Sequence, residues 1–163
     1  MKLCNDTITV FNARVDPEAG GNVWKPTVIT GASWFLTDAS TVDTAKGGLV
    51  AANKATIRIP EGADAGGKTY ADPKAYANAE SVAGLWTLQA GDVIVKGSVP
   101  TQGNREQGTG NRGDGETPAP ADPVPINWTP AKLKKAYADC VTVLGVTDNR
   151  RAPNAKHWRV TGT

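Results

Sequence analysis

His157 is the only histidine in the chain, and it limits the catalytic chemistry that can be considered. A nucleophilic enzyme of the Ser–His or Cys–His type would have to use it, with Cys140 or a serine as the nucleophile and a third group to orient the ring. The sequence contains no G-x-S-x-G motif and no recognisable context for a nucleophilic cysteine. His157 directly precedes Trp158 at the start of an expected strand, so we expect it to pack or hydrogen-bond structurally.

Other chemical signatures are weak. A metal site needs three or four convergent Cys, His or carboxylate ligands, and one histidine with two distant cysteines, Cys4 and Cys140, does not supply them. The glycines of 103–115 lie between polar residues and not between a strand and a helix, so a phosphate-binding loop is not expected. Arg112-Gly113-Asp114 is a tripeptide that arises by chance in polar, glycine-rich sequence. We therefore expect no metal, no cofactor and no enzymatic activity.

Five tryptophans offer a binding alternative, because flat indole rings can stack on sugars. They are Trp24, Trp34, Trp86, Trp128 and Trp158. Four lie in expected strands and Trp128 lies just before a helix, so core packing or a subunit contact is the competing interpretation. A carbohydrate-binding β-module remains open as an alternative function, and it would require at least two indoles exposed on one face.

A small basic cluster lies near the end of the chain, where Arg150-Arg151 precedes Lys156 and Arg159. It could face an acidic neighbour or DNA phosphate, or it could be a solvated surface. The net charge is only +2 at pH 7, which is too mild to indicate a nucleic-acid-binding protein from composition alone.

Length and composition favour one mainly β domain that covers residues 1–163. Hydrophobic residues make up 39% of the chain, and the 18 glycines and 11 prolines favour short strands with many turns. No run approaches the roughly 18 apolar residues of a membrane helix. The N-terminus lacks the apolar segment of a signal peptide, so we expect synthesis in a cytosol without disulfide formation.

The most strongly patterned stretch is Leu85 to Gly97, which predicts a strand, a turn at Gln89–Asp92 and a second strand. Gly91 can adopt a positive φ, and the Asp92 side chain can hydrogen-bond to the nearby backbone. We expect this hairpin to be the element against which the core packs.

Other strands are predicted from alternating apolar residues at 6–15, 23–36, 49–59, 141–146 and 157–161. Pro26 favours an edge position within its strand, and Gly31 indicates a bulge. Asp72-Pro73 and Thr129-Pro130 are N-cap and first-turn pairs that predict short helices at 73–80 and 130–139.

Two polar stretches are expected to be long mobile loops. Thr37 to Gly48 is small and polar throughout, and a loop of that length is usually functional or mobile. Thr101 to Pro125 contains Val124 as its only large apolar residue, so it cannot bury enough surface to offset its ordering entropy. We interpret it as a flexible Gly/Pro-rich insertion in the single domain.

A series of motifs covers nearly the whole chain outside that insertion. In order they are D-T-I-T-V-F-N at 6–12, G-A-S-W at 31–34, I-R-I-P at 57–60, T-Y-A-D-P at 69–73, W-T-L-Q-A-G-D-V-I-V-K-G at 86–97, and V-T-D-N-R-R-A-P-N-A-K-H-W-R-V-T-G at 146–162. This ordered set resembles the head-closure or head–tail connector proteins, of the stopper and minor-capsid types, of long-tailed bacteriophages.

The resemblance implies a small β-barrel with one or two short helices, assembled as a homo-oligomeric ring, a hexamer or dodecamer. The ring would lie in the neck of the virion, between portal or adaptor proteins and tail-terminator or other tail proteins. It would be assembled in the host bacterial cytoplasm, away from membranes, and would retain the packaged DNA that it meets in the channel. Another neck or tail-completion protein is the alternative within the same assembly.

Two sets of residues follow from this resemblance as candidate contact sites. By its position between G-A-S-W and I-R-I-P, the segment Thr37–Gly48 would be the loop that enters the channel. Its candidate residues are Asp38, Ser40, Asp43, Lys46 and Gly47. Candidate partner-contact loops carry Arg105, Arg112, Arg150 and Arg151.

Overall fold

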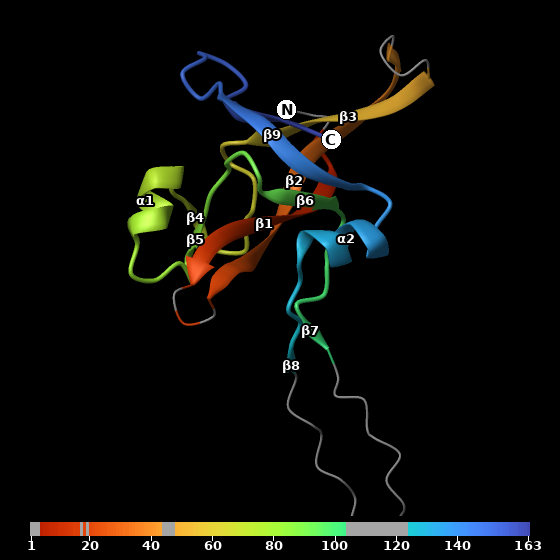
Figure 1. Cartoon of the computed structure of the whole chain (residues 1–163). Coiled ribbons are helices and arrows are strands. Elements are labelled where there is room, and N and C mark those ends of the chain that lie inside the picture. The colour runs from red at the N-terminus through yellow and green to blue at the C-terminus, as the bar shows by residue number, and fades with distance from the viewer. Residues whose placement is uncertain (1–3, 17, 19, 44–47, 104–123) are drawn as a thin grey trace, which may run out of the picture.

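The computed structural model describes residues 4–16, 18, 20–43, 48–103 and 124–163. Six strands close into a barrel in the order β1-β2-β3-β10-β9-β6, and every neighbouring pair is antiparallel. The mainly β fold and the small barrel predicted from the sequence are therefore confirmed. Figure 1 shows the barrel with its two short helices on the outside.

The elements have the following bounds. The barrel strands are β1 (Asp6–Asp16), β2 (Gly21–Asp43), β3 (Gly48–Pro60), β6 (Val93–Lys96), β9 (Cys140–Asp148) and β10 (His157–Gly162). Two minor sheets pair β4 (Thr69–Tyr70) with β5 (Leu85–Trp86) and β7 (Gln102–Gly103) with β8 (Val124–Pro125). The helices are α1 (Pro73–Asn78) and α2 (Pro130–Ala136).

The bulge predicted at Gly31 lies in the β1–β2 pair. Asp6 pairs with Ala32 and Thr7 with Thr30, so Gly31 is the extra residue on β2, with a φ of 84°. A positive φ suits glycine because it has no Cβ. Pro26 pairs with β1 on one side only, since β2 meets β3 no earlier than Ser33. That is the edge position its missing N–H requires.

The predicted Leu85–Gly97 hairpin is wrong in its pairing, although its turn is confirmed. The backbone N–H of Asp92 donates to the carbonyl of Gln89 at 3.2 Å, and Gly91 has a φ of 93°. However, β5 pairs in parallel with β4, while β6 pairs with β1 and β9. Local alternation predicted the two strands but not their partners: β6 pairs with β1 and β9 and so closes the barrel, while β5 pairs with β4 in a separate two-stranded sheet.

The prediction that Thr37–Gly48 forms a loop is also wrong for the described residues of that segment. Thr37 to Asp43 continues β2 and pairs with Gly48 to Lys54 of β3, from Thr37↔Lys54 to Asp43↔Gly48. The polar composition indicated a loop. The two strands nevertheless form a β-ribbon, because pairing satisfies the backbone hydrogen-bonding groups of both strands whatever their side chains are.

This ribbon extends past the barrel. β10 pairs with β3 only as far as Ala55, so beyond that residue β2 and β3 pair only with each other. In Figure 1 the two strands reach beyond the rest of the barrel at the upper right. Seven residues at about 3.3 Å each give the ribbon a reach of roughly 20 Å.

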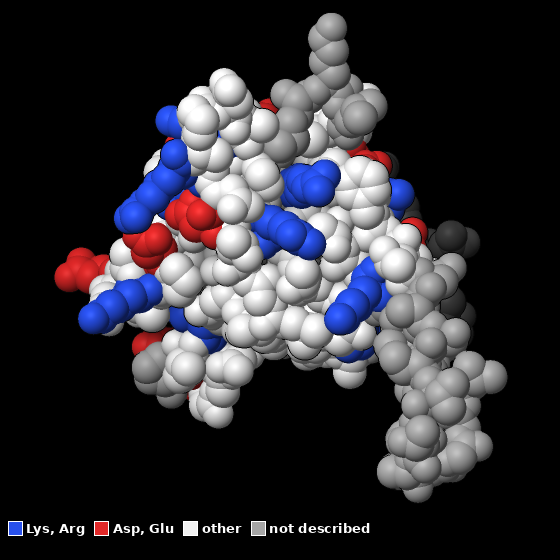
Figure 2. Space-filling model, turned by 90° about the horizontal axis from the view of Figure 1, so that it is seen from above, with Lys and Arg blue, Asp and Glu red and all other residues white. Residues whose placement is uncertain are grey.

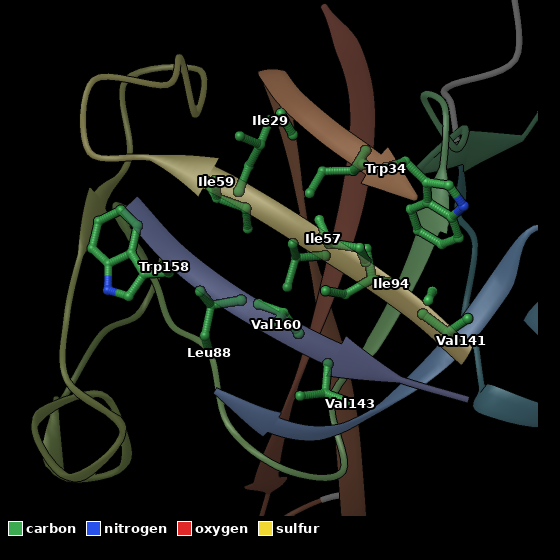
Figure 3. Close-up of a cluster of buried hydrophobic side chains, with 14 of the residues drawn as sticks. Ile29, Trp34, Ile57, Ile59, Leu88, Ile94, Val141, Val143, Trp158 and Val160 are labelled. Carbon is green, nitrogen blue, oxygen red and sulfur yellow. The ribbon is translucent and has the colours of Figure 1, made fainter. Parts of the chain in front are cut away.

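The main core fills the barrel with side chains from all six strands (Figure 3). Fully buried members include Ile8, Ile29, Ile57, Ile94 and Val160. A second cluster, around Phe11 and Leu133, lies between β1, β6 and α2. Thr129 caps α2 by accepting from the Lys132 N–H at 3.4 Å, as predicted, whereas Asp72 makes no side-chain cap for α1.

A buried carboxylate joins the β1 strand to the Gln89–Asp92 turn. Asp92 is fully buried, and it accepts hydrogen bonds from Asn12 Nδ2 (2.8 Å), the Ala13 N–H (3.1 Å) and the Gln89 N–H (3.0 Å). Asn12 Nδ2 also donates to the Thr87 carbonyl at 2.8 Å. Burial raises the pKa of Asp92 from its ordinary value of 3.8 to about 6, against the opposing effect of these hydrogen bonds.

The raised pKa of Asp92 predicts a specific pH dependence of stability. Between pH 3.8 and about 6 the folded state binds the Asp92 proton more readily than the unfolded state. This contribution to the free energy of unfolding is therefore complete below pH 3.8 and is lost as the pH rises to about 6, by about 3 kcal/mol. Urea unfolding across that window should show the decline in the native protein relative to Asp92→Asn. Parallel pH profiles for the two proteins would contradict it.

The predicted insertion at 101–125 begins and ends in paired strands. Gln102 pairs with Pro125 and Gly103 with Val124, antiparallel. Residues 104–123 lie outside the described residues, so the prediction of mobility for them stays a prediction.

Candidate functional surfaces

The β2–β3 ribbon carries the residues predicted to enter a channel. Asp38, Ser40 and Asp43 lie on β2, where their backbones pair with Asn53, Ala51 and Gly48 of β3, respectively. Lys46 and Gly47 lie outside the described residues. The structure therefore places the three described candidates on one projecting element, well away from the core of the barrel.

An aromatic cluster anchors the long turn between β9 and β10. The ring centroids of Tyr70 and Trp86 are 5.1 Å apart, and Trp158 lies 4.4 Å from Tyr70 and 5.5 Å from Trp86. The Arg150 guanidinium carbon lies 4.7 Å from the Trp158 centroid and 5.1 Å from that of Tyr70. Arg150 thus covers the end of the barrel core by cation–π contact.

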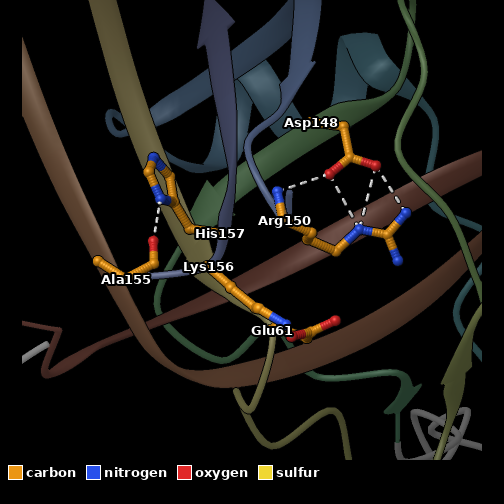
Figure 4. Close-up of polar contacts among 6 residues, drawn as sticks. All are labelled: Glu61, Asp148, Arg150, Ala155, Lys156 and His157. Carbon is orange, nitrogen blue, oxygen red and sulfur yellow. Dashed lines mark hydrogen bonds and ion pairs between the residues drawn. The ribbon is translucent and has the colours of Figure 1, made fainter. Parts of the chain in front are cut away.

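Asp148 holds Arg150 in that position (Figure 4). Nε of Arg150 lies 3.0 and 3.1 Å from the two carboxylate oxygens of Asp148, and Nη2 lies 2.6 Å from Oδ2. These hydrogen bonds lower the pKa of Asp148 to about 2. Of the candidate partner-contact residues, Arg150 is therefore already engaged within the chain, Arg151 is exposed, and Arg105 and Arg112 lie outside the described residues.

His157 is held by its own turn. Its Nδ1 lies 2.6 Å from the Ala155 carbonyl oxygen, and its Nε2 lies 3.3 Å from Nδ2 of Asn149. A neutral ring that donates from Nδ1 and accepts at Nε2 satisfies both contacts. His157 therefore hydrogen-bonds within the turn that leads into β10, as expected from the sequence, and Figure 4 shows its contact with Ala155.

The five indoles are distributed between the two cores. Trp34, Trp86 and Trp158 are buried in the main core, and Trp24 and Trp128 pack half-buried against the second cluster. The Nε1 of Trp128 donates to the Pro100 carbonyl at 2.8 Å. A sugar-stacking face needs at least two exposed indoles, and none of the five is exposed.

A groove of about 580 Å³ runs between the β1–β2 hairpin and residues 80–83. Its basic residues are Arg14, Lys25 and Lys68. The Lys68 ammonium donates to the Pro26 carbonyl (2.7 Å) and to the Thr27 hydroxyl (3.0 Å), and burial together with the charge of Lys25 lowers its pKa. Arg14 donates to the Ala79 carbonyl. The two best-placed cations therefore bind the protein's own backbone, which makes the groove a poor anion site.

Within the described ranges, no group of three or more His, Cys, Asp or Glu side chains is arranged to hold a metal ion. No helix of that part of the chain is long and apolar enough to cross a membrane.

Comparison of the chain with curated proteins and with solved structures finds no match. A family model described as a family of unknown function, DUF6751, matches residues 3–163. Because the match spans nearly the whole sequence, the chain belongs to the DUF6751 family.

Proposed function

We propose that this protein is a structural component of the neck of a long-tailed bacteriophage. Copies of the barrel form a ring between portal or adaptor proteins and the tail, and the β2–β3 ribbon of each copy projects into the channel. The ring closes the filled head, retains the packaged DNA and gives the tail a docking surface. The ordered motifs at 6–12, 31–34, 57–60, 69–73, 86–97 and 146–162 support this proposal through their resemblance to head-closure proteins.

The projecting ribbon is the observation that carries the proposal. It lies where the motif order puts the channel segment, between G-A-S-W and I-R-I-P, and it leaves a closed barrel with no further strand pairing beyond Ala55. A barrel supplies the rigid body of a ring subunit, because closure removes exposed sheet edges. A ribbon of roughly 20 Å is long enough to act at a distance from that body.

The charges of the segment do not decide how it meets DNA, because Asp38 and Asp43 repel phosphate whereas Lys46 attracts it. Retention then rests on steric closure by several ribbons, and not on affinity for the DNA. Opening requires only that each ribbon bend at its base, since its strands pair with nothing else beyond Ala55.

The test removes the ribbon and leaves the barrel. Residues 38–53 are replaced by an Asn-Gly turn, which is compatible with a tight β-hairpin. The altered gene is placed in the phage or prophage that carries the native one. We expect the variant to fold and to enter particles, and we expect those particles to lose their DNA, so that the titre falls to that of a deletion mutant.

The control is a variant with the native ribbon length and Ser40→Ala, which should give the native titre. The proposal fails if the native protein is absent from purified particles, or if the ribbon-less variant retains DNA and infectivity. Light scattering and negative-stain images of the purified protein, with and without a portal complex, give an independent test. A ring is expected in at least one of these conditions.

A further inference from the structure

Two arginines lie side by side on the outer surface of the barrel. Arg58 of β3 and Arg159 of β10 are direct cross-strand partners in an antiparallel pair. Their neighbours along each strand, Ile57, Ile59, Trp158 and Val160, are buried, so the alternation of the strands directs both arginines outward. Like charges placed directly opposite each other in a sheet are destabilising.

In the described part of the chain, neither arginine forms an ion pair with an acidic side chain. Among the described residues, the ion pairs are Lys96–Asp6, Arg150–Asp148 and Lys156–Glu61, and none involves Arg58 or Arg159. Figure 2 looks onto the side that β3 and β9 form at the top of Figure 1. The basic side chains near the centre of that view have no acidic side chain between them, while several acidic ones gather toward the left edge.

Exposed apolar residues lie on the two strands that border the arginine pair, β2 and β9. Phe35 of β2 is 48% exposed. The guanidinium carbon of Arg58 lies 5.6 Å from the centroid of the Phe35 ring, so the Arg58 side chain covers that ring. On β9, the partner of Arg159 is Thr147, and Leu144, three residues earlier on that strand, is 54% exposed where the β9–β10 register shifts. We call the surface formed by Phe35, Arg58, Arg159 and Leu144 the arginine face. It spans four neighbouring strands of the barrel, β2-β3-β10-β9.

We propose that the arginine face is a docking surface for an acidic segment of a partner protein. Paired guanidinium groups suit carboxylates because each can form two parallel hydrogen bonds with one carboxylate. A carboxylate between the two arginines would also remove their mutual repulsion, so binding recovers free energy that the unbound sheet lacks. The Phe35 ring holds Arg58 in place beforehand, which lowers the entropy cost of docking.

The composition of the face favours protein over nucleic acid. Aromatic residues and arginine are enriched in the cores of protein interfaces, and flanking apolar side chains exclude water from the charged contacts. A nucleic-acid surface gathers more lysines and arginines in a patch or stripe that follows the phosphates. The arginine face has two arginines, one of them over an exposed aromatic ring, and an exposed leucine on the neighbouring strand β9, which is closer to the first pattern.

The experiment uses the full-length purified protein and two probes, a short fluorescein-labelled peptide of alternating Glu and Leu and a labelled DNA duplex of the same net charge. Fluorescence anisotropy compares the native protein with the double variant Arg58→Gln, Arg159→Gln. The matched control is Lys134→Gln, Lys135→Gln, which removes the same charge from exposed positions in the last turn of α2. Thermal unfolding confirms that both variants fold.

We expect the native protein and the lysine control to bind the peptide with equal affinity. The arginine variant should bind it with an affinity lower by about tenfold or more. The proposal is overturned if the peptide does not bind, if both variants lose binding equally, or if the arginine variant loses DNA binding that is tighter than peptide binding. It is also overturned if the arginine variant changes only self-association in sedimentation, because the face would then join copies of this chain. The assay needs no phage particle, so its outcome is independent of the neck proposal.

Discussion

Replacing Asp92 by alanine should lower the free energy of unfolding at pH 7 by about 3–5 kcal/mol. The substitution removes a fully buried acceptor from three N–H donors, those of Asn12, Ala13 and Gln89. Each orphaned donor costs free energy because it gave up water on folding. Loss of the unfavourable buried charge offsets only part of this cost.

Urea unfolding followed by tryptophan fluorescence measures the effect, with an unchanged dependence on urea as the sign that the unfolding transition itself is the same. Asp92→Asn is the matched control. It keeps the shape and one acceptor oxygen, but turns an amide group toward a donor, so it should lose about 1–2 kcal/mol. An alanine variant as stable as the asparagine variant would show that the three hydrogen bonds do not hold the turn to β1.

Replacing Trp158 by alanine should cost about 3–5 kcal/mol for a different reason. Its side chain is 3% exposed and contacts Tyr70 and Trp86 of the β4–β5 sheet, while Arg150 lies over it. Removing it opens a large cavity at the end of the core and takes away the surface on which Arg150 lies. The neighbouring strands cannot collapse into that space, because both edges of β10 are already paired.

Trp128→Ala is the comparison for this prediction. Trp128 is half-buried at the second cluster and contributes one hydrogen bond to the Pro100 carbonyl. Its loss should cost about 1 kcal/mol, the usual size for a partly exposed site. Thermal unfolding of both variants should therefore rank Trp158→Ala far below Trp128→Ala. Equal losses would mean that the aromatic cluster does not hold this end of the barrel.

The sequence predicts the local structure well and the long-range pairing poorly. Alternation identifies β1, β3 and β10, and Gly31 reveals the bulge, because each signal depends on adjacent residues. The pairing of β6 with β1 and β9 depends on which distant edge completes the barrel, and no local pattern encodes that choice. The Thr37–Asp43 strand escapes detection for the same reason, since its residues are polar and only β3 makes it a strand.

The candidate surfaces divide in the same way. The turn at Asp92 is predictable from its own residues, but its bond to Asn12 joins positions 80 residues apart. Arg58 and Arg159 each alternate with apolar residues, which predicts that both point outward. Their direct opposition depends on the β3–β10 register, and that register is set by the whole barrel.

The β7–β8 pair has a practical consequence. Because Gln102–Gly103 pairs with Val124–Pro125, the two ends of the segment between them lie side by side. The length of polypeptide between them adds only about 0.6 kcal/mol of closure cost for each doubling. Foreign sequence spliced in at this point, such as an affinity tag or a fluorescent domain, should therefore leave the barrel unperturbed. The protein thus offers a natural attachment site for labels with which to locate it in any larger assembly.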